Sequence, residues 1–127
     1  MNTTSVEKQR IKKKILVVDD DPGILDVLQI MLEESGYEVE TSQEALLIEK
    51  KLIVPPDIIL LDMWMSGING KDVCRKLKSE SKTRNITIVM ISANNDIEKI
   101  ANESGADAFM SKPFQMNDLL ALLEKFQ

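Results

Sequence analysis

Continuous apolar runs alternate with segments of helical periodicity along this 127-residue chain. Three apolar runs are typical of strands buried on both faces of a sheet: KILVV at 14–18, DIILL at 57–61 and ITIVMI at 86–91. Two shorter segments, at 37–41 and 106–110, are predicted as strands as well. Apolar residues spaced by three and four positions predict helices over 22–35, 43–52, 70–80, 95–104 and 115–126.

A strand followed by a helix, repeated five times, predicts an α/β fold. Strands that lack polar alternation need cover on both faces, so we expect a doubly wound, five-stranded parallel sheet between layers of helices. The predicted domain spans residues 14–127. Residues 1–13 are predicted to be a disordered or frayed basic segment.

Composition narrows the class of protein. Hydrophobic residues make up 43% of the chain, and no apolar run reaches membrane-spanning length or forms a signal peptide. A single cysteine, Cys74, allows no internal disulfide and suits the reducing cytoplasm, where we expect the protein. The absence of histidine excludes a Ser–His–Asp triad and a Cys/His zinc site.

The net charge of −5 is unevenly distributed. Residues 1–14 hold five basic residues and one acidic residue, a charge of +4, which leaves −9 for the rest of the chain. An acidic body argues against direct binding to nucleic acid. The basic segment is interpreted as a solvated lead into the first strand.

Polar residues stand just past the predicted strands. They are Asp19, Asp20 and Asp21 after the first strand, Thr41 and Ser42 after the second, and Asp62, Ser92 and Lys112 after the next three. Open parallel sheets bind their ligands outside the carboxyl ends of the strands, so we expect these groups to form one site.

This combination of side chains suits phosphoryl chemistry. A hard divalent cation would relieve the repulsion among the carboxylates, and Mg²⁺ typically takes one or two carboxylates together with waters and phosphate oxygens. Lys112 is the only basic residue between Lys99 and Lys125, and an amine beside a metal stabilises a transferring phosphoryl group. A carboxylate can itself be the nucleophile and form an aspartyl phosphate.

Four motifs, taken in order, resemble those of the response-regulator receiver domain of two-component signalling. They are ILVVDDDP (15–22), DIILLDMWMSGING (57–70), TIVMISA (87–93) and GADAFMSKPF (105–114). The resemblance extends from about Lys14 to Gln127. It implies a (βα)5 flavodoxin-like fold with the strand order 2-1-3-4-5.

The resemblance also implies a phosphoacceptor and a metal site. Asp62 corresponds to the phosphoacceptor. The implied ligands of Mg²⁺ are Asp19, Asp20, Asp62 and the backbone carbonyl of Trp64, with Mn²⁺ or Ca²⁺ as substitutes for Mg²⁺.

Other residues that match the family motifs are implied to bind the phosphoryl group or to change conformation when the domain is phosphorylated. Ser92, the backbone of Ala93 and Lys112 correspond to the phosphoryl-binding groups. Ser92 and Phe109 correspond to the switch pair, although a plain core role for Phe109 stays open. Lys112–Pro113 corresponds to a cis peptide bond.

The implied function is that of a phosphoacceptor signalling domain in a phosphorelay. The donor would be a sensor histidine kinase or a histidine phosphotransfer protein, and the phosphorylated domain would act on a downstream protein through residues 95–126 or form a homodimer. The domain would promote its own phosphorylation and dephosphorylation without being a multiple-turnover enzyme. No contact with nucleic acid or membrane is expected.

The loop after Asp62 departs from the family pattern Asp-x-x-Met-Pro-x-x-x-Gly. Met65 and Gly70 match, whereas Ser66 replaces the proline, which removes no ligand. Trp64 is bulky for its position. Our hypothesis is that it slows access of the attacking water and lengthens the lifetime of the phosphoryl group.

Two other functions stay open at this point. The pattern Asp19-x-Asp21 resembles haloacid-dehalogenase phosphatases, with Asp19 as nucleophile and Asp21 as acid/base, although the chain is short for that family. A receiver-like binding module that is never phosphorylated is the other alternative.

Three residues have simpler interpretations that we prefer. Asp21 precedes Pro22, a pattern typical of a helix N-cap with proline at the first helical position. Asp57 begins its strand and so lies at the wrong end of the sheet, where a structural role is expected. Cys74 is predicted to be a small core residue.

Overall fold

A computed structural model describes residues 13–44, 55–65 and 68–126. Its main sheet has five parallel strands in the order β2-β1-β3-β6-β7, which confirms the predicted fold and strand order. The strands are β1 (Lys14–Val18), β2 (Glu38–Ser42), β3 (Ile58–Asp62), β6 (Thr87–Ser92) and β7 (Ala108–Ser111). Each strand lies within two residues of its predicted bounds at either end.

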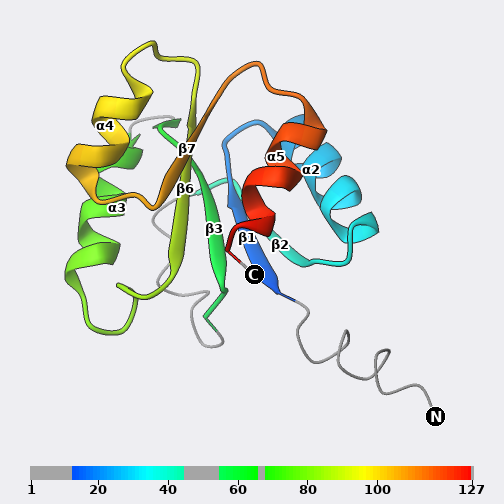
Figure 1. The fold of residues 1–127 in the computed structure, drawn as a ribbon, viewed down its shortest axis with the longest axis horizontal. Coiled ribbons are helices and arrows are strands. Elements are labelled where there is room, and N and C mark those ends of the chain that lie inside the picture. Colours follow the sequence, from blue (N-terminus) through cyan, green and yellow to red (C-terminus); the bar gives the residue numbers. More distant parts are fainter. Residues whose placement is uncertain (1–12, 45–54, 66–67, 127) are drawn as a thin grey trace.

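Four described helices cover the two faces of the sheet (Figure 1). Helices α2 (Pro22–Glu34) and α5 (Met116–Glu124) lie on one face, and α3 (Gly70–Ser79) and α4 (Ile97–Ser104) lie on the other. The helix predicted over 43–52 and the segment 1–12 lie outside the described residues. None of the helices in the described ranges is long and apolar enough to cross a membrane.

The hydrophobic core consists of two layers, one on each face of the sheet. Strand residues alternate between them, so that Ile15 and Val17 pack with Leu28 of α2, whereas Leu16 and Val18 belong to the layer under α3 and α4. Strand β3 is buried along its whole length, as its unbroken apolar run predicts. The two layers hold the carboxyl ends of the strands in fixed positions.

Two of the simpler interpretations are confirmed away from the polar edge. Asp57 stands at the start of β3, where its Oδ2 accepts a hydrogen bond of 2.8 Å from the backbone N–H of Lys14. Cys74 is fully buried in the layer under α3 and α4. Burial raises the pKa of the Cys74 thiol, so it remains a neutral, unreactive core group.

A small two-stranded hairpin, which the sequence did not predict, follows β3. Its strands are β4 (Trp64–Met65) and β5 (Ile68–Asn69), paired antiparallel. The hairpin joins the end of β3 to the start of α3. It therefore stands at the edge of the sheet where the polar residues gather.

Candidate functional site

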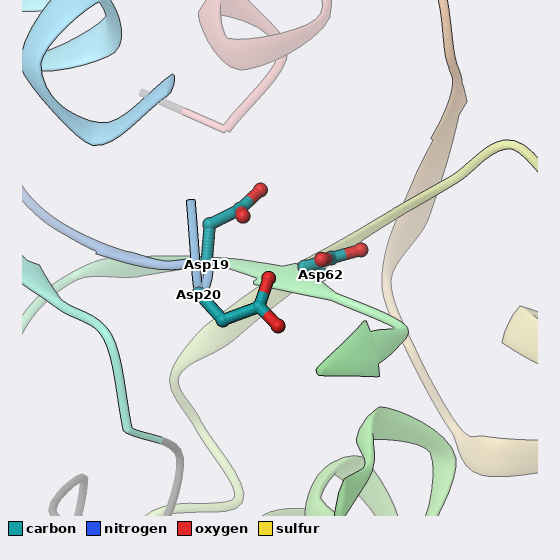
Figure 2. A group of neighbouring side chains, drawn as sticks. All are labelled: Asp19, Asp20 and Asp62. Carbon is teal, nitrogen blue, oxygen red and sulfur yellow. The ribbon is translucent and has the colours of Figure 1, made fainter. Parts of the chain in front are cut away.

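Three carboxylates meet where the sheet changes its winding direction. Strand β1 lies between β2 and β3. The chain therefore runs from β1 to β2 on one side of β1 and then crosses to β3 on the other side of β1. Such a switch point is where open α/β sheets bind ligands. Asp19 and Asp20 follow β1, Asp62 ends β3, and one oxygen from each lies within 4.8 Å of the others (Figure 2).

Asp19 is held on both sides by donors. It is 4% exposed, its Oδ1 accepts a hydrogen bond of 2.9 Å from the backbone N–H of Asp21, and its Oδ2 lies 3.2 Å from Nζ of Lys112. The same Nζ lies 3.7 Å from Oδ1 of Asp62. Lys112 thus stands between two buried acids, and its positive charge offsets the repulsion between them.

The residues after β6 and β7 reach the same edge. The backbone N–H of Lys112 donates a hydrogen bond of 2.9 Å to the carbonyl of Ser92, and the Lys112–Pro113 bond is cis. The hydroxyl of Ser92 is buried and accepts a bond of 3.0 Å from the N–H of Asn94. Phe109 is half-buried and packs against the core layer under α3 and α4.

The surroundings of Asp62 change the pKa of its carboxyl group. Burial raises the pKa of Asp62 to about 6, the neighbouring Lys112 lowers it, Asp19 and Asp20 raise it, and a hydrogen bond from the Trp64 backbone lowers it. At pH 7 the group is therefore ionised but poorly solvated. A desolvated carboxylate with few donors is suited to act as a nucleophile.

Asp21 does not join the other acids. Its Oδ1 accepts hydrogen bonds from the backbone N–H groups of Gly23 at 2.9 Å and Ile24 at 3.4 Å, with Pro22 at the first position of α2. The predicted N-cap is thereby confirmed. Of the three consecutive acids, Asp19 and Asp20 belong to the carboxylate cluster, whereas Asp21 caps a helix.

The hairpin directs the backbone of Trp64 toward the acids. Trp64 and Asn69 face each other across β4 and β5, and the N–H of Gly70 donates to the carbonyl of Met63 at 2.7 Å, just outside this pair. Such a flanking bond marks the pair as one without its own hydrogen bonds. The N–H and C=O of Trp64 therefore point away from β5, on the side where the N–H bonds Asp62.

Gly70 is required by lack of space. A Cβ at this position would lie 2.8 Å from the carbonyl oxygen of Asp62 and 2.8 Å from Cα of Met63, both backbone atoms. Helix α3 therefore begins in direct contact with the peptide that carries Asp62.

These residues fit a hard divalent cation. Oxygen atoms from Asp19, Asp20 and Asp62 converge, and the carbonyl of Trp64 points to the same side of its strand. Carboxylate and carbonyl oxygens with room for water are the ligands that Mg²⁺ prefers. The single positive charge of Lys112 neutralises only part of the negative charge of the three carboxylates. A cation would therefore still be attracted to the cluster.

Sequence reasoning missed the residues that shape the loop after Asp62. The hairpin has two residues in each strand and leaves no periodic signal. Asn69, whose Oδ1 accepts a hydrogen bond of 2.9 Å from the N–H of Lys71, caps α3. An asparagine just before the first helical residue is an N-cap signal that the sequence does contain.

Comparison with known proteins places the chain among signalling proteins. Residues 15–124 match the family model described as response regulator receiver domain. The chain is 38% identical over 116 residues to the DNA-binding response regulator MtrA of Mycolicibacterium smegmatis, covering 87% of this chain and 49% of that one. It is 35% identical over 111 residues to the DNA-binding regulator RpaA of Synechocystis, covering 85% and 46%. The chain therefore spans about half the length of these relatives.

Solved structures share the fold over nearly the whole chain. The chemotaxis response regulator CheY4 of Vibrio cholerae has a TM-score of 0.82 at 27% identity, covering 91% of this chain and 99% of that one. The response regulator TrrA of Thermotoga maritima, solved in complex with Mg²⁺–BeF, has a TM-score of 0.80 at 29% identity, covering 91% and 99%.

We predict that Asp62→Asn stabilises the metal-free protein at neutral pH. The folded-state pKa of Asp62 is raised above its unfolded value of 3.8, so ionisation weakens the fold as pH rises through about 6. The gain in free energy of unfolding should be on the order of 2–3 kcal/mol at pH 7.5 and should shrink toward pH 4. Urea unfolding in the presence of EDTA measures it, and an equal gain at both pH values would contradict the electrostatic origin.

We predict that Gly70→Ala destabilises the protein by roughly 1–3 kcal/mol, since the new methyl group forces the backbone at 62–63 to move. Gly36→Ala is the matched control, because Gly36 has a φ of +98° but open space around its Cβ position. It should cost only about 1 kcal/mol. Only Gly70→Ala should also weaken Mg²⁺ binding, measured by calorimetry, and equal effects of the two variants would contradict the steric argument.

Proposed function

The chain belongs to the response regulator receiver domain family of two-component signalling, and from that premise we propose that Asp62 accepts a phosphoryl group from the phosphohistidine of a partner protein. The partner is a sensor histidine kinase or a histidine phosphotransfer protein, since this chain has no histidine of its own. One observation carries the proposal. A desolvated carboxylate, Asp62, lies beside two further acids and one lysine at the switch point of the sheet.

The transfer exchanges one bond to phosphorus for another. A carboxylate oxygen of Asp62 forms the new P–O bond as the P–N bond to the donor imidazole breaks, and the imidazole leaves with the electron pair. Lys112 neutralises negative charge on the phosphoryl oxygens. The hydroxyl of Ser92 and the backbone N–H of Ala93 donate hydrogen bonds to these oxygens.

Mg²⁺ is the proposed cation for this site, with Mn²⁺ or Ca²⁺ as substitutes that use the same oxygens. Asp19, Asp20, Asp62 and the backbone carbonyl of Trp64 would hold it. When bound, the ion supplies positive charge between the acidic cluster and the phosphoryl group. The Mg²⁺–BeF complex of TrrA supports this assignment by similarity of fold and sequence.

An apolar groove offers a place for the donor protein beside the acceptor. The groove has a volume of about 660 Å³ between α2 and the start of α5, and Lys112 and Ala93 lie in its lining. Val27 and Met31 of α2, which also line it, are 55% and 38% exposed. A helix of the donor packed there would bring its histidine toward Asp62.

Phosphorylation is proposed to change the surface formed by residues 95–126. The new charge on Asp62 would draw Ser92 and Lys112 toward the phosphoryl oxygens and allow Phe109 to repack. Such an equilibrium shifts only by the difference in stabilisation of its two states. The altered surface would bind a downstream protein or a second copy of the chain, and the acidic charge of the domain argues against direct contact with DNA.

The proposed role is that of a regulator that is modified and then reset, not of a multiple-turnover enzyme. A phosphatase with Asp19 as nucleophile finds no support in the geometry. That mechanism needs Asp21 as acid/base, but the Asp21 carboxylate caps α2.

We predict a magnesium-dependent gain of one phosphoryl group when the protein is incubated with acetyl phosphate. A carboxylate oxygen of Asp62 would attack phosphorus, and acetate would leave. Intact mass with and without Mg²⁺ measures the gain, and Asp62→Asn should abolish it because its amide is a poor nucleophile. Asp57→Asn, at the opposite end of β3, is the matched control and should be labelled like the wild type.

Two results would overturn the proposal. Labelling that survives in Asp62→Asn would move the nucleophile to another carboxylate. No labelling by acetyl phosphate or by a phosphorylated histidine kinase would favour a receiver-like module that is never phosphorylated.

We predict that Trp64→Asn shortens the lifetime of the phosphoryl group several-fold. Trp64 is two residues past Asp62 and is 57% exposed, so its ring can cover the approach of water without supporting the core. Loss of label after removal of acetyl phosphate measures the rate. Trp64→Phe keeps much of the bulk and should stay near the wild-type rate, whereas an unchanged rate in Trp64→Asn would disprove shielding by the ring.

A further inference from the structure

The β4–β5 hairpin cannot maintain its own geometry. Each strand has two residues, which is too short for independent stability. Its conformation must therefore come from its attachments on both sides, to which the hydrogen bond from the Gly70 N–H to the Met63 carbonyl also contributes. On the β4 side, Met63 donates a backbone hydrogen bond of 2.9 Å to Ile91 of β6, which fixes the start of the hairpin to the sheet.

Asn69 provides the attachment on the other side. It is the last residue of β5 and also the N-cap of α3, with φ −94° and ψ 115°. Its side chain accepts the hydrogen bond from Lys71 that the first turn of the helix cannot satisfy internally. One side chain thus ties the extended conformation of β5 to the start of α3.

Asn69 also stands directly opposite Trp64 in the hairpin. In a pair of this type the N–H and C=O of Trp64 point away from β5, so the side that they face depends on the register of the pair. Loss of the cap would loosen the Asn69 backbone, although the hydrogen bond from the Gly70 N–H to the Met63 carbonyl would remain. The direction of the Trp64 carbonyl would then be less firmly fixed.

We propose that Asn69 is a positioning residue for the cation site, acting through its cap on α3 and its pairing with Trp64. The inference rests on the proposed binding of a divalent cation by Asp19, Asp20, Asp62 and the Trp64 carbonyl. Asn69 itself does not contact the ion. It fixes the direction of a backbone ligand, as residues around metal ligands commonly do.

The test is the Mg²⁺ dissociation constant of the full chain, measured by calorimetry and by titration of Trp64 fluorescence, at a temperature where every variant is folded. Asn69→Ala should weaken Mg²⁺ binding about tenfold, within the range for loss of a supporting group. Asn69→Ser restores a neutral capping oxygen and should remain near the wild-type constant. Asp57→Ala removes a hydrogen bond at the far end of the sheet and should leave the constant unchanged.

The outcomes separate the inference from the proposed function. If Asn69→Ala lowers the melting temperature but binds Mg²⁺ as the wild type does, the cap is purely structural and the inference is wrong. Equal weakening in Asn69→Ser or in Asp57→Ala would overturn it too, since the cap would not be the cause. A wild type that binds no Mg²⁺ would overturn the cation site itself.

Discussion

The repulsion among Asp19, Asp20 and Asp62 is the interaction that the polar edge of this sheet must balance. One oxygen from each lies within 4.8 Å of one oxygen of each of the others, and two of the three residues are buried. The fold offsets this repulsion with donors at fixed positions, namely the ammonium of Lys112 and the backbone N–H of Asp21. The pKa of Asp62 still stays raised to about 6, chiefly because burial desolvates the carboxylate, with Asp19 and Asp20 adding to the rise. A desolvated carboxylate flanked by two further acids is suited to attract a cation and to act as a nucleophile, which is the role proposed for Asp62.

Rigid strands are what allow such a cluster to persist. Two hydrophobic layers cover β1 and β3, so neither strand can move to relieve the repulsion at its end. The loop after Asp62 is fixed in the same way by backbone contacts. Met63 is bonded to β6, and Gly70 packs against the Asp62 peptide so closely that no side chain fits. Local chain geometry and core packing thus hold together charges that would separate in a looser fold.

Most of the fold could be predicted from the sequence because burial on both faces leaves an unbroken apolar pattern, as in Ile58–Leu61. The candidate site could be predicted for a related reason, since the end of each such strand fixes where the next polar residue must lie. The β4–β5 strand pair could not be predicted. Its geometry depends on one flanking hydrogen bond, one cap and the space beside Gly70, and none of these produces periodicity. The sequence places Lys112 at the same edge as Asp19, but it does not show that the Lys112 ammonium lies nearer to Asp19 than to Asp62.

The position of Lys112 suggests how a change at Asp62 would reach the rest of the domain. Its Nζ is 3.2 Å from Asp19 and 3.7 Å from Asp62, so the nearer partner is the acid that is not modified. A phosphoryl group on Asp62 would carry more negative charge than the carboxylate and would draw Nζ away from Asp19. The backbone of Lys112 is bonded to Ser92, and the strands that these residues follow or end, β7 and β6, are paired through Phe109 and Met90. Redistribution of one ammonium between two acids would therefore act on β6 and β7 together, and β7 lies within the segment 95–126 that we propose as the output surface.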